Sequence, residues 1–123
     1  MDKMDKKVLI IDDCDMTRRL LSYIVRANGY KIMSATNGFE ALEIMASNQI
    51  DLVITDLNMP QMDGLELTKN LRAGEAYQEI PIIMVTTEGG DDNIKTGMAA
   101  GVSAYLVKPF SAQKLLYEMS KLI

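Results

Sequence analysis

The sequence predicts a doubly wound α/β fold, in which five parallel strands form one sheet flanked by five helices. Two observations support this prediction. Five short apolar runs alternate along the chain with stretches of helical periodicity. Each run is apolar almost without interruption, as expected for strands that are covered on both faces. The alternation therefore implies parallel strands joined by right-handed crossovers.

The five strands are predicted from these runs and from the polar residues that follow them. Each run contains mostly Val, Ile, Leu or Met and is short enough for a strand. The predicted strands span residues 7–12, 30–35, 51–56, 81–86 and 103–108.

The first two helices are predicted from helical spacing and from their ends. In the first, apolar residues fall in two rows, and the helix ends at Asn28-Gly29, a typical C-terminal signal. The rows are Met16, Leu20 and Ile24, and Leu21 and Val25. We expect Asp15 to cap the start of this helix. The second helix begins at Asn37, where Asn37-Gly38-Phe39-Glu40 reads as a capping box.

The last three helices are predicted in the same way. The third contains Leu65, Leu67, Thr68 and Leu71 and ends near Gly74. The fourth, at about 91–100, has the weakest helical pattern, because Gly97 and several small residues lower its propensity. Ser111 caps the fifth helix, whose inner side carries Leu115, Leu116, Met119 and Leu122.

Length and composition predict one cytoplasmic domain spanning residues 1–123, most simply a monomer. The chain has 123 residues, of which 48% are hydrophobic and 24% charged, an ordinary globular composition. A net charge of −4 without a basic stretch disfavours a nucleic-acid partner. The lone Cys14 excludes an internal disulfide. No apolar run approaches the roughly 20 residues of a membrane helix, so we expect no membrane association.

Chemically active residues stand at the ends of four predicted strands. Asp12 and Asp13 follow the first run, Asp56 follows the third, Thr86 ends the fourth, and Lys108 follows the fifth. Because ligands bind at the carboxyl edge of an open parallel sheet, we expect these side chains to form one site.

Three neighbouring carboxylates repel one another, so the predicted cluster needs a cation. Mg²⁺ suits an open site of this kind, since it binds few carboxylates together with waters and phosphate oxygens. Mg²⁺ and the Lys108 ammonium together would neutralise the three aspartates. The site would then accept a phosphoryl group, and an aspartate carboxylate can act as the nucleophile toward it. Thr86 and Lys108 would contact the phosphoryl oxygens.

Several short motifs, all in register, carry a family resemblance. They are Asp12-Asp13, the segment from Asp56 to Gly64, Thr86-Thr87-Glu88, Ala99-Ala100-Gly101 and the segment from Tyr105 to Phe110. Together they closely resemble the receiver domain of two-component response regulators, especially the single-domain chemotaxis (CheY-like) type. The resemblance runs from about residue 7 to the last residue. It implies the flavodoxin-like strand order 2-1-3-4-5.

The resemblance implies a role for each site residue. Asp56 would accept a phosphoryl group from a histidine kinase or phosphotransfer protein, with Thr86 and Lys108 contacting that group. Asp13 and Asp56 would bind Mg²⁺ directly, Asp12 through water and Asn58 through its backbone carbonyl. The chain would catalyse only its own phosphorylation and dephosphorylation, and would not be an enzyme acting on external substrates.

The resemblance also implies an output. Tyr105 would be an aromatic switch that turns inward when Thr86 moves toward the phosphoryl group. A downstream protein would read the face made by the fourth helix, fifth strand and fifth helix, within residues 88–118. Asn58, Thr87 and Glu88 would tune the lifetime of the phosphoryl group. Lys108-Pro109 would be a cis peptide that aims the lysine inward.

An alternative from the enzymes is a phosphatase of the haloacid dehalogenase type. Residues 13–17 match its D-x-D-x-T loop, with Asp13 as nucleophile and Asp15 as acid/base. This reading leaves Asp56 and Lys108 without a role, and the chain has no segment for a cap. An FMN-binding flavodoxin is disfavoured because the first loop is acidic, whereas phosphate needs hydroxyl and glycine residues.

Two further residues beside the acidic pair have simple interpretations. Arg18 and Arg19 are expected on a solvated helix face or, alternatively, as part of a surface that docks the kinase. The acidic pair is expected to disfavour the thiolate of Cys14.

Overall fold

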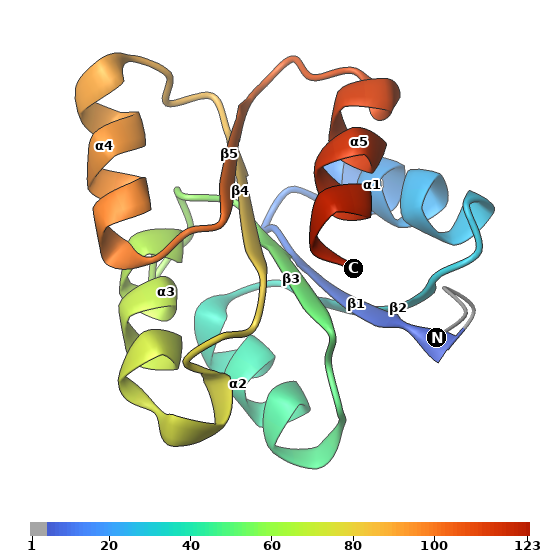
Figure 1. The fold of residues 1–123 in the computed structure, drawn as a ribbon, viewed down its shortest axis with the longest axis horizontal. Coiled ribbons are helices and arrows are strands. Elements are labelled where there is room, and N and C mark those ends of the chain that lie inside the picture. The colour runs from blue at the N-terminus through green and yellow to red at the C-terminus, as the bar shows by residue number, and fades with distance from the viewer. Residues whose placement is uncertain (1–4) are drawn as a thin grey trace.

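The sheet in the computed structural model, which describes residues 5–123, has five parallel strands in the order β2-β1-β3-β4-β5 (Figure 1). The strands are β1 (Lys7–Ile11), β2 (Lys31–Ala35), β3 (Leu52–Thr55), β4 (Ile82–Thr86) and β5 (Ala104–Val107). The predicted fold class and strand order are both confirmed. All five strands are shorter than predicted by a residue at one or both ends, so Asp12, Asp56 and Lys108 lie just past the strands that precede them.

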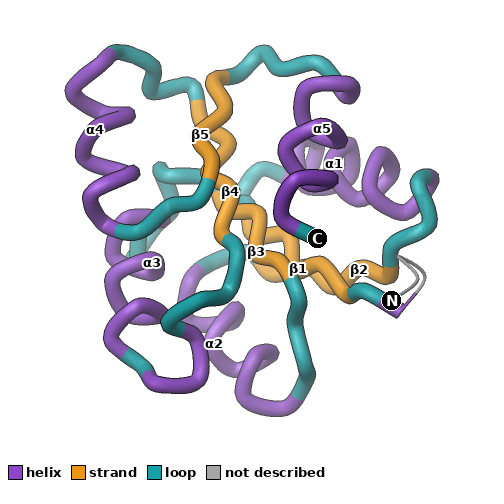
Figure 2. Tube along the Cα trace, in the orientation of Figure 1, coloured by secondary structure: helices purple, strands orange, loops and turns teal. Residues whose placement is uncertain are grey.

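Five helices cover the two faces of this sheet. They are α1 (Asp15–Ala27), α2 (Gly38–Ser47), α3 (Gly64–Ala73), α4 (Asp91–Ala100) and α5 (Ala112–Leu122). Helices α1 and α5 lie on one face, and α2, α3 and α4 lie on the other (Figures 1 and 2). The short 3₁₀ turn η2 (Glu75–Tyr77) follows α3 and was not predicted.

The predicted helix ends are mostly confirmed. Asn37 and Ser111 each accept a backbone N–H three residues on, at 2.8 and 3.0 Å, and Gly74 is the C-cap of α3. Gly29 follows α1 with φ of 97°, the left-handed conformation that glycine adopts easily. The prediction for Asp15 is wrong, because Cys14 is the N-cap and Asp15 is the first helical residue.

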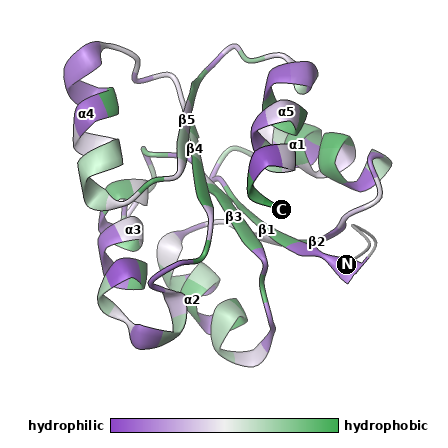
Figure 3. Cartoon of the chain, in the orientation of Figure 1, coloured by the Kyte–Doolittle hydropathy of each residue, from purple (hydrophilic) through white to green (hydrophobic). Residues whose placement is uncertain are grey.

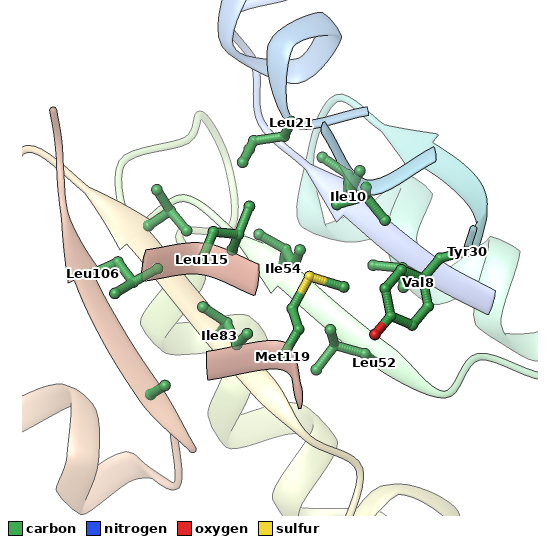
Figure 4. Close-up of a cluster of buried hydrophobic side chains, with 13 residues drawn as sticks. Val8, Ile10, Leu21, Tyr30, Leu52, Ile54, Ile83, Leu106, Leu115 and Met119 are labelled. Carbon is green, nitrogen blue, oxygen red and sulfur yellow. The ribbon is translucent and has the colours of Figure 1, made fainter. Parts of the chain in front are cut away.

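Apolar side chains of the strands point alternately into two core clusters, one under each helical layer. Figure 4 shows the first cluster, where Leu21 of α1 and Leu115 and Met119 of α5 pack against Ile10, Ile54 and Ile83. The second cluster packs α2 and α3 on the other face. The strands are mostly apolar, whereas the helices carry both hydrophilic and hydrophobic residues (Figure 3). Burial of this kind is worth roughly 25 cal/mol per Å² of apolar surface.

Of the two predicted apolar rows of α1, one is buried, and the other reaches the core only at Ile24, which is half-buried. Leu21 and Val25 are buried, whereas Met16 is 81% exposed and Leu20 is 52% exposed. Helical spacing places the two rows on neighbouring faces, but it does not decide which face rests on the sheet.

No helix within residues 5–123 is long and apolar enough to cross a membrane.

Candidate functional site

The parallel sheet brings the acidic residues of two strands together. The N–H of Asp12 donates to the carbonyl of Ala35, and the N–H of Asp56 donates to the carbonyl of Ile11, at 3.2 and 3.0 Å. These bonds continue the strand pairing by one residue at the carboxyl edge. One carboxylate oxygen from each of Asp12, Asp13 and Asp56 lies within 4.8 Å of the other two. Asp12 is buried, Asp56 is half-buried and Asp13 is exposed.

The ammonium of Lys108 is the nearest positive charge to this cluster. Its Nζ lies 3.1 Å from Asp12 Oδ2 and 3.6 Å from Asp56 Oδ2. The Lys108-Pro109 peptide bond is cis. The lysine backbone N–H donates to the carbonyl of Thr86 at 2.7 Å, which fixes the end of β5 beside the end of β4.

Asp56 is the acid of this cluster whose pKa is clearly shifted by its surroundings. Burial raises the pKa of its carboxyl group, the Lys108 charge opposes that shift, and the Asp12 charge adds to it. Its Oδ1 accepts the N–H of Leu57 at 2.8 Å. The carboxylate is therefore poorly solvated and depends on the lysine and backbone donors for its stabilisation.

Asp12 is held from both its side chain and its backbone. Its Oδ1 accepts the N–H of Cys14 at 2.9 Å, and its carbonyl accepts from Nη1 of Arg18 at 2.8 Å. Arg18 also pairs with Asp15. The interpretation of Arg18 as a solvated residue is therefore wrong: only 17% of its side chain is exposed. No sequence signal predicts this contact, since it depends on how α1 leaves the sheet.

The expectation for Cys14 is also wrong. Its pKa is lowered, chiefly by the nearby backbone N–H and hydroxyl of Thr17, while burial and the Asp12 charge oppose this shift. The N-cap position accounts for this, because helix N-termini direct unpaired N–H groups at the capping atom.

Gly64 lets α3 begin directly against the backbone of Asp56. The N–H of Gly64 donates to the carbonyl of Leu57 at 2.8 Å. A Cβ at this position would lie 3.0 Å from the carbonyl carbon of Asp56, so any other residue would displace the backbone there.

Two polar side chains meet at the rim of the site. Nδ2 of Asn58 donates to Oε1 of Glu88 at 3.2 Å, although the two residues are 30 positions apart. Thr87, between Thr86 and Glu88, is exposed. The resemblance placed all three near the site, but the contact between Asn58 and Glu88 was not foreseen.

A short chain of hydrogen bonds connects Thr86 to Tyr105. The N–H of Glu88 donates to Oγ1 of Thr86 at 3.2 Å, and the hydroxyl of Tyr105 donates to the carbonyl of Glu88 at 2.5 Å. The half-buried Tyr105 ring lies so close to Gly97 of α4 that a Cβ there would be 3.0 Å from two ring carbons. Burial, together with the charges of Glu88 and Asp56, raises the pKa of this tyrosine.

The acidic cluster fits a hard divalent cation. Its donor atoms are carboxylate oxygens, the ligands that Mg²⁺ prefers, and Asp13 is open to solvent, which leaves room for waters or a phosphate oxygen. Asp15 stands outside this group, since its side chain is 70% exposed and pairs with Arg18. The second carboxylate of the phosphatase reading is therefore not directed at the site.

Comparison with known proteins identifies the family of this chain. Residues 8–120 match the model of the response regulator receiver domain. The chain belongs to the response regulator receiver family.

Relatives of this receiver domain include chemotaxis proteins. It is 43% identical to a chemotaxis protein CheY homolog of Campylobacter jejuni over 111 residues, which cover 89% of this chain and 85% of that protein. It is 44% identical to chemotaxis protein CheY1 of Helicobacter pylori strain J99, with coverage of 89% and 90%. The structure of Vibrio cholerae CheY4 superimposes with a TM-score of 0.90 at 36% identity, covering 96% of this chain and 98% of that one.

This receiver domain is thus a phosphorylation-activated response regulator similar to the chemotaxis type. Receiver domains bind Mg²⁺ at a cluster of aspartates, and Asp12, Asp13 and Asp56 form such a cluster here. The comparisons do not favour the haloacid dehalogenase alternative.

Proposed function

We propose that Asp56 accepts a phosphoryl group from the phosphohistidine of a histidine kinase or phosphotransfer protein, in a reaction that needs Mg²⁺. The observation that carries this proposal is the convergence of three carboxylates and one ammonium at the carboxyl edge of the sheet. Of the three acids, Asp56 is the one that is half-buried and also contacts Lys108. It is therefore reachable by a donor and flanked by a cation.

In the transfer step, an ionised carboxylate oxygen of Asp56 attacks the phosphorus atom. The P–O bond to the aspartate forms as the P–N bond to the donor imidazole breaks, and the imidazole nitrogen keeps the electron pair and takes up a proton. Lys108 and the hydroxyl of Thr86 contact the phosphoryl oxygens and stabilise their charge. When bound, Mg²⁺ adds positive charge at those oxygens.

We assign the metal ligands from the same cluster. Asp13 and Asp56 bind the ion directly, Asp12 binds through water, and Asn58 offers its backbone carbonyl. Burial of Asp12 behind Lys108 supports its indirect role, and the exposure of Asp13 supports direct binding. Few protein ligands at an open site imply weak affinity.

For the output, we propose that Thr86 and Tyr105 transmit the phosphorylation state to a downstream protein. The hydrogen bonds through Glu88 supply a physical connection between them. The receiving face lies within residues 88–118. It presents exposed apolar side chains from α4, β5 and α5, namely Met98, Val107 and Tyr117, at 46%, 39% and 59% exposure. Such side chains suit a protein partner.

The wider proposal is that residues 1–123 act as one receiver domain and as a monomeric cytoplasmic switch. Its chemistry is limited to its own phosphorylation and dephosphorylation, without turnover of an external substrate.

Two matched substitutions test the proposal. With radiolabelled acetyl phosphate and Mg²⁺, we expect Asp56→Asn to lose stable labelling, because the amide is no nucleophile. Asp15→Asn should label almost as well as the parent protein, since Asp15 is exposed and outside the cluster. Chelator should abolish labelling of the parent protein. If Asp15→Asn loses the chemistry while Asp56→Asn keeps it, the phosphatase reading is right and the proposal is wrong.

A further inference from the structure

The edge of the sheet formed by β2 carries a basic groove that the proposed function does not use. The groove has a volume of about 450 Å³ and runs between α1 and β2. Its lining residues are Arg18, Arg19, Ser22, Tyr23 and Arg26 of α1 and Ile32 and Ser34 of β2. The chain has four arginines and a net charge of −4, and three of those arginines gather in this groove. A local positive charge of this kind on an acidic protein attracts an acidic ligand.

Two of the three arginines are free to bind a ligand. Arg18 is committed to the carbonyl of Asp12 and to Asp15. Within residues 5–123, the exposed side chains of Arg19 and Arg26 form no ion pair or hydrogen bond. Tyr23 lies between them in sequence and is 72% exposed, so it adds a flat apolar surface. Guanidinium groups of this kind bind carboxylates with two parallel hydrogen bonds.

The strand at the floor of the groove has an unpaired edge. Strand β2 pairs with β1 only, so its other side has no neighbouring strand within the described sheet. The edge of a strand presents backbone N–H and C=O groups that can pair with an extended peptide. Ile32 is half-buried and Ser34 is exposed, so both residues of β2 that line the groove reach solvent.

The spacing of the free arginines fits an extended chain beside β2. Arg19 and Arg26 are seven residues apart on α1, or about 10 Å along its axis. An extended peptide covers this distance in roughly three residues, and side chains at alternate positions point the same way. Acidic side chains two to four residues apart would therefore meet both guanidinium groups.

From these observations we infer that the groove is a docking site for an acidic, extended segment of a partner protein. The segment pairs with the edge of β2, and its carboxylates bind Arg19 and Arg26. A nucleic acid is a poorer fit, because its affinity depends on many phosphate contacts and the groove offers two free arginines on an acidic protein. Strands β2 and β5 are the two opposite edges of the sheet, so this partner and one bound at α4, β5 and α5 would not overlap (Figure 1).

A titration followed by nuclear magnetic resonance tests this inference on the full chain. The probe is a six-residue peptide of alternating Glu and Val with blocked ends, and the control probe has Lys in place of Glu. We expect the acidic peptide to shift the amide signals of residues 19–26 and 31–35, and the basic peptide to leave them unchanged. Higher salt should weaken the binding.

Two matched double variants test whether the charges of Arg19 and Arg26 bind the peptide. Arg19→Gln combined with Arg26→Gln should weaken binding by about tenfold, the order expected for removing two exposed charge pairs. Lys69→Gln combined with Lys121→Gln changes the net charge equally at exposed sites on other helices, and should change affinity less than about twofold. Both double variants should keep the parent labelling by acetyl phosphate, so this test is separate from that of the proposed function.

Four outcomes would overturn the inference. The first is an absence of shifts along β2 and α1 with the acidic peptide. The second is an equal loss of affinity in the two double variants. The third is tighter binding of single-stranded DNA or of anionic lipid vesicles at the same residues. The fourth is a dependence of the β2 signals on protein concentration without peptide, which would show that a second copy of the chain occupies the edge.

Discussion

At the scale of single residues, Asp56 has an environment that stabilises its neutral form. Burial raises its pKa above the ordinary carboxyl value of 3.8, despite the nearby Lys108. A carboxyl group with a raised pKa in the folded state stabilises the fold below its unfolded pKa. That contribution is lost as the pH rises through the folded pKa. At neutral pH the ionised Asp56 therefore destabilises the protein.

We accordingly predict that Asp56→Asn stabilises the protein at pH 7 in the presence of chelator. The gain should be on the order of 1 kcal/mol, or roughly 2–6 °C in melting temperature. It should shrink toward zero as the pH falls below the ordinary carboxyl range, where Asp56 is neutral in both states. Thermal melts of the two proteins across pH 3–8 measure this. A stabilisation that is constant over the whole range would contradict the argument.

We propose that the rim residues Asn58, Thr87 and Glu88 set how easily water reaches the phosphorylated aspartate. Thr87 adds a methyl group at the rim, while Asn58 and Glu88 are joined by a hydrogen bond there and can orient a water. We predict that Thr87→Ala speeds autodephosphorylation and that Asn58→Leu slows it. Each change should be about three- to thirtyfold, equivalent to roughly 0.7–2 kcal/mol of barrier. Decay of the labelled protein measures both rates, and equal rates in all three proteins would show that access is controlled elsewhere.

At the scale of elements, the segment between β4 and α4 connects the site to the proposed partner face. The hydroxyl of Thr86 accepts a hydrogen bond from the N–H of Glu88, and the hydroxyl of Tyr105 donates one to the carbonyl of Glu88. Glu88 is therefore hydrogen-bonded to both residues. We propose that the Thr86 hydroxyl moves toward a phosphoryl group, which would break the first bond and free the segment. On this proposal the partner face would then change, because Tyr105 is bonded to that segment.

We predict that Thr86→Ala is still phosphorylated but responds poorly at the partner face. The nucleophile and the metal ligands remain, while the hydroxyl that connects them to Glu88 is gone. Amide chemical shifts before and after addition of acetyl phosphate measure the response. In the parent protein they should change across 88–110, and in the variant only near Asp56. Full shifts across 88–110 in the variant would exclude Thr86 as the connection.

The sequence predicted those elements and residues that depend on local pattern. Strand ends fixed the positions of Asp12, Asp56 and Lys108, because parallel strands align their carboxyl ends. Arg18 could not be predicted in this way, since its contact with the Asp12 carbonyl depends on the angle at which α1 crosses the sheet. The exposure of Met16 and Leu20 depends on the same angle. The lowered pKa of the Cys14 thiol could not be predicted either, because Cys14 caps α1 at a position one residue earlier than expected.

At the scale of the whole molecule, metal binding and folding are linked. A ligand that binds only the folded state stabilises it, and at ten times the dissociation constant the gain is about 1.4 kcal/mol. For a domain of this length this corresponds to roughly 3–6 °C in melting temperature. Because the three carboxylates converge only in the folded chain, the proposed Mg²⁺ site should show this effect.

We therefore predict that the melting temperature of the parent protein rises with Mg²⁺ concentration and that Asp13→Ala largely removes the rise. Asp91→Ala is a suitable control, because it also deletes an exposed acid but lies at the start of α4. Calorimetry with increasing MgCl₂ and a matched NaCl series measures the effect. An equal rise in Asp13→Ala would mean that the ion binds elsewhere on the protein.

Helix α4 packs against the rest of the molecule through few buried residues. Its only buried residue is Gly97, against which the Tyr105 ring rests, whereas α3 buries four residues. At its C-terminal end, the guanidinium of Arg72 donates to the carbonyl of Gly101 from two nitrogens, at 3.0 and 2.8 Å. The helix thus contacts the Tyr105 ring at Gly97, and hydrogen bonds from Arg72 hold its C-terminal end. Its amides should exchange with solvent through local opening well before those of α3, and little free energy is needed to move it.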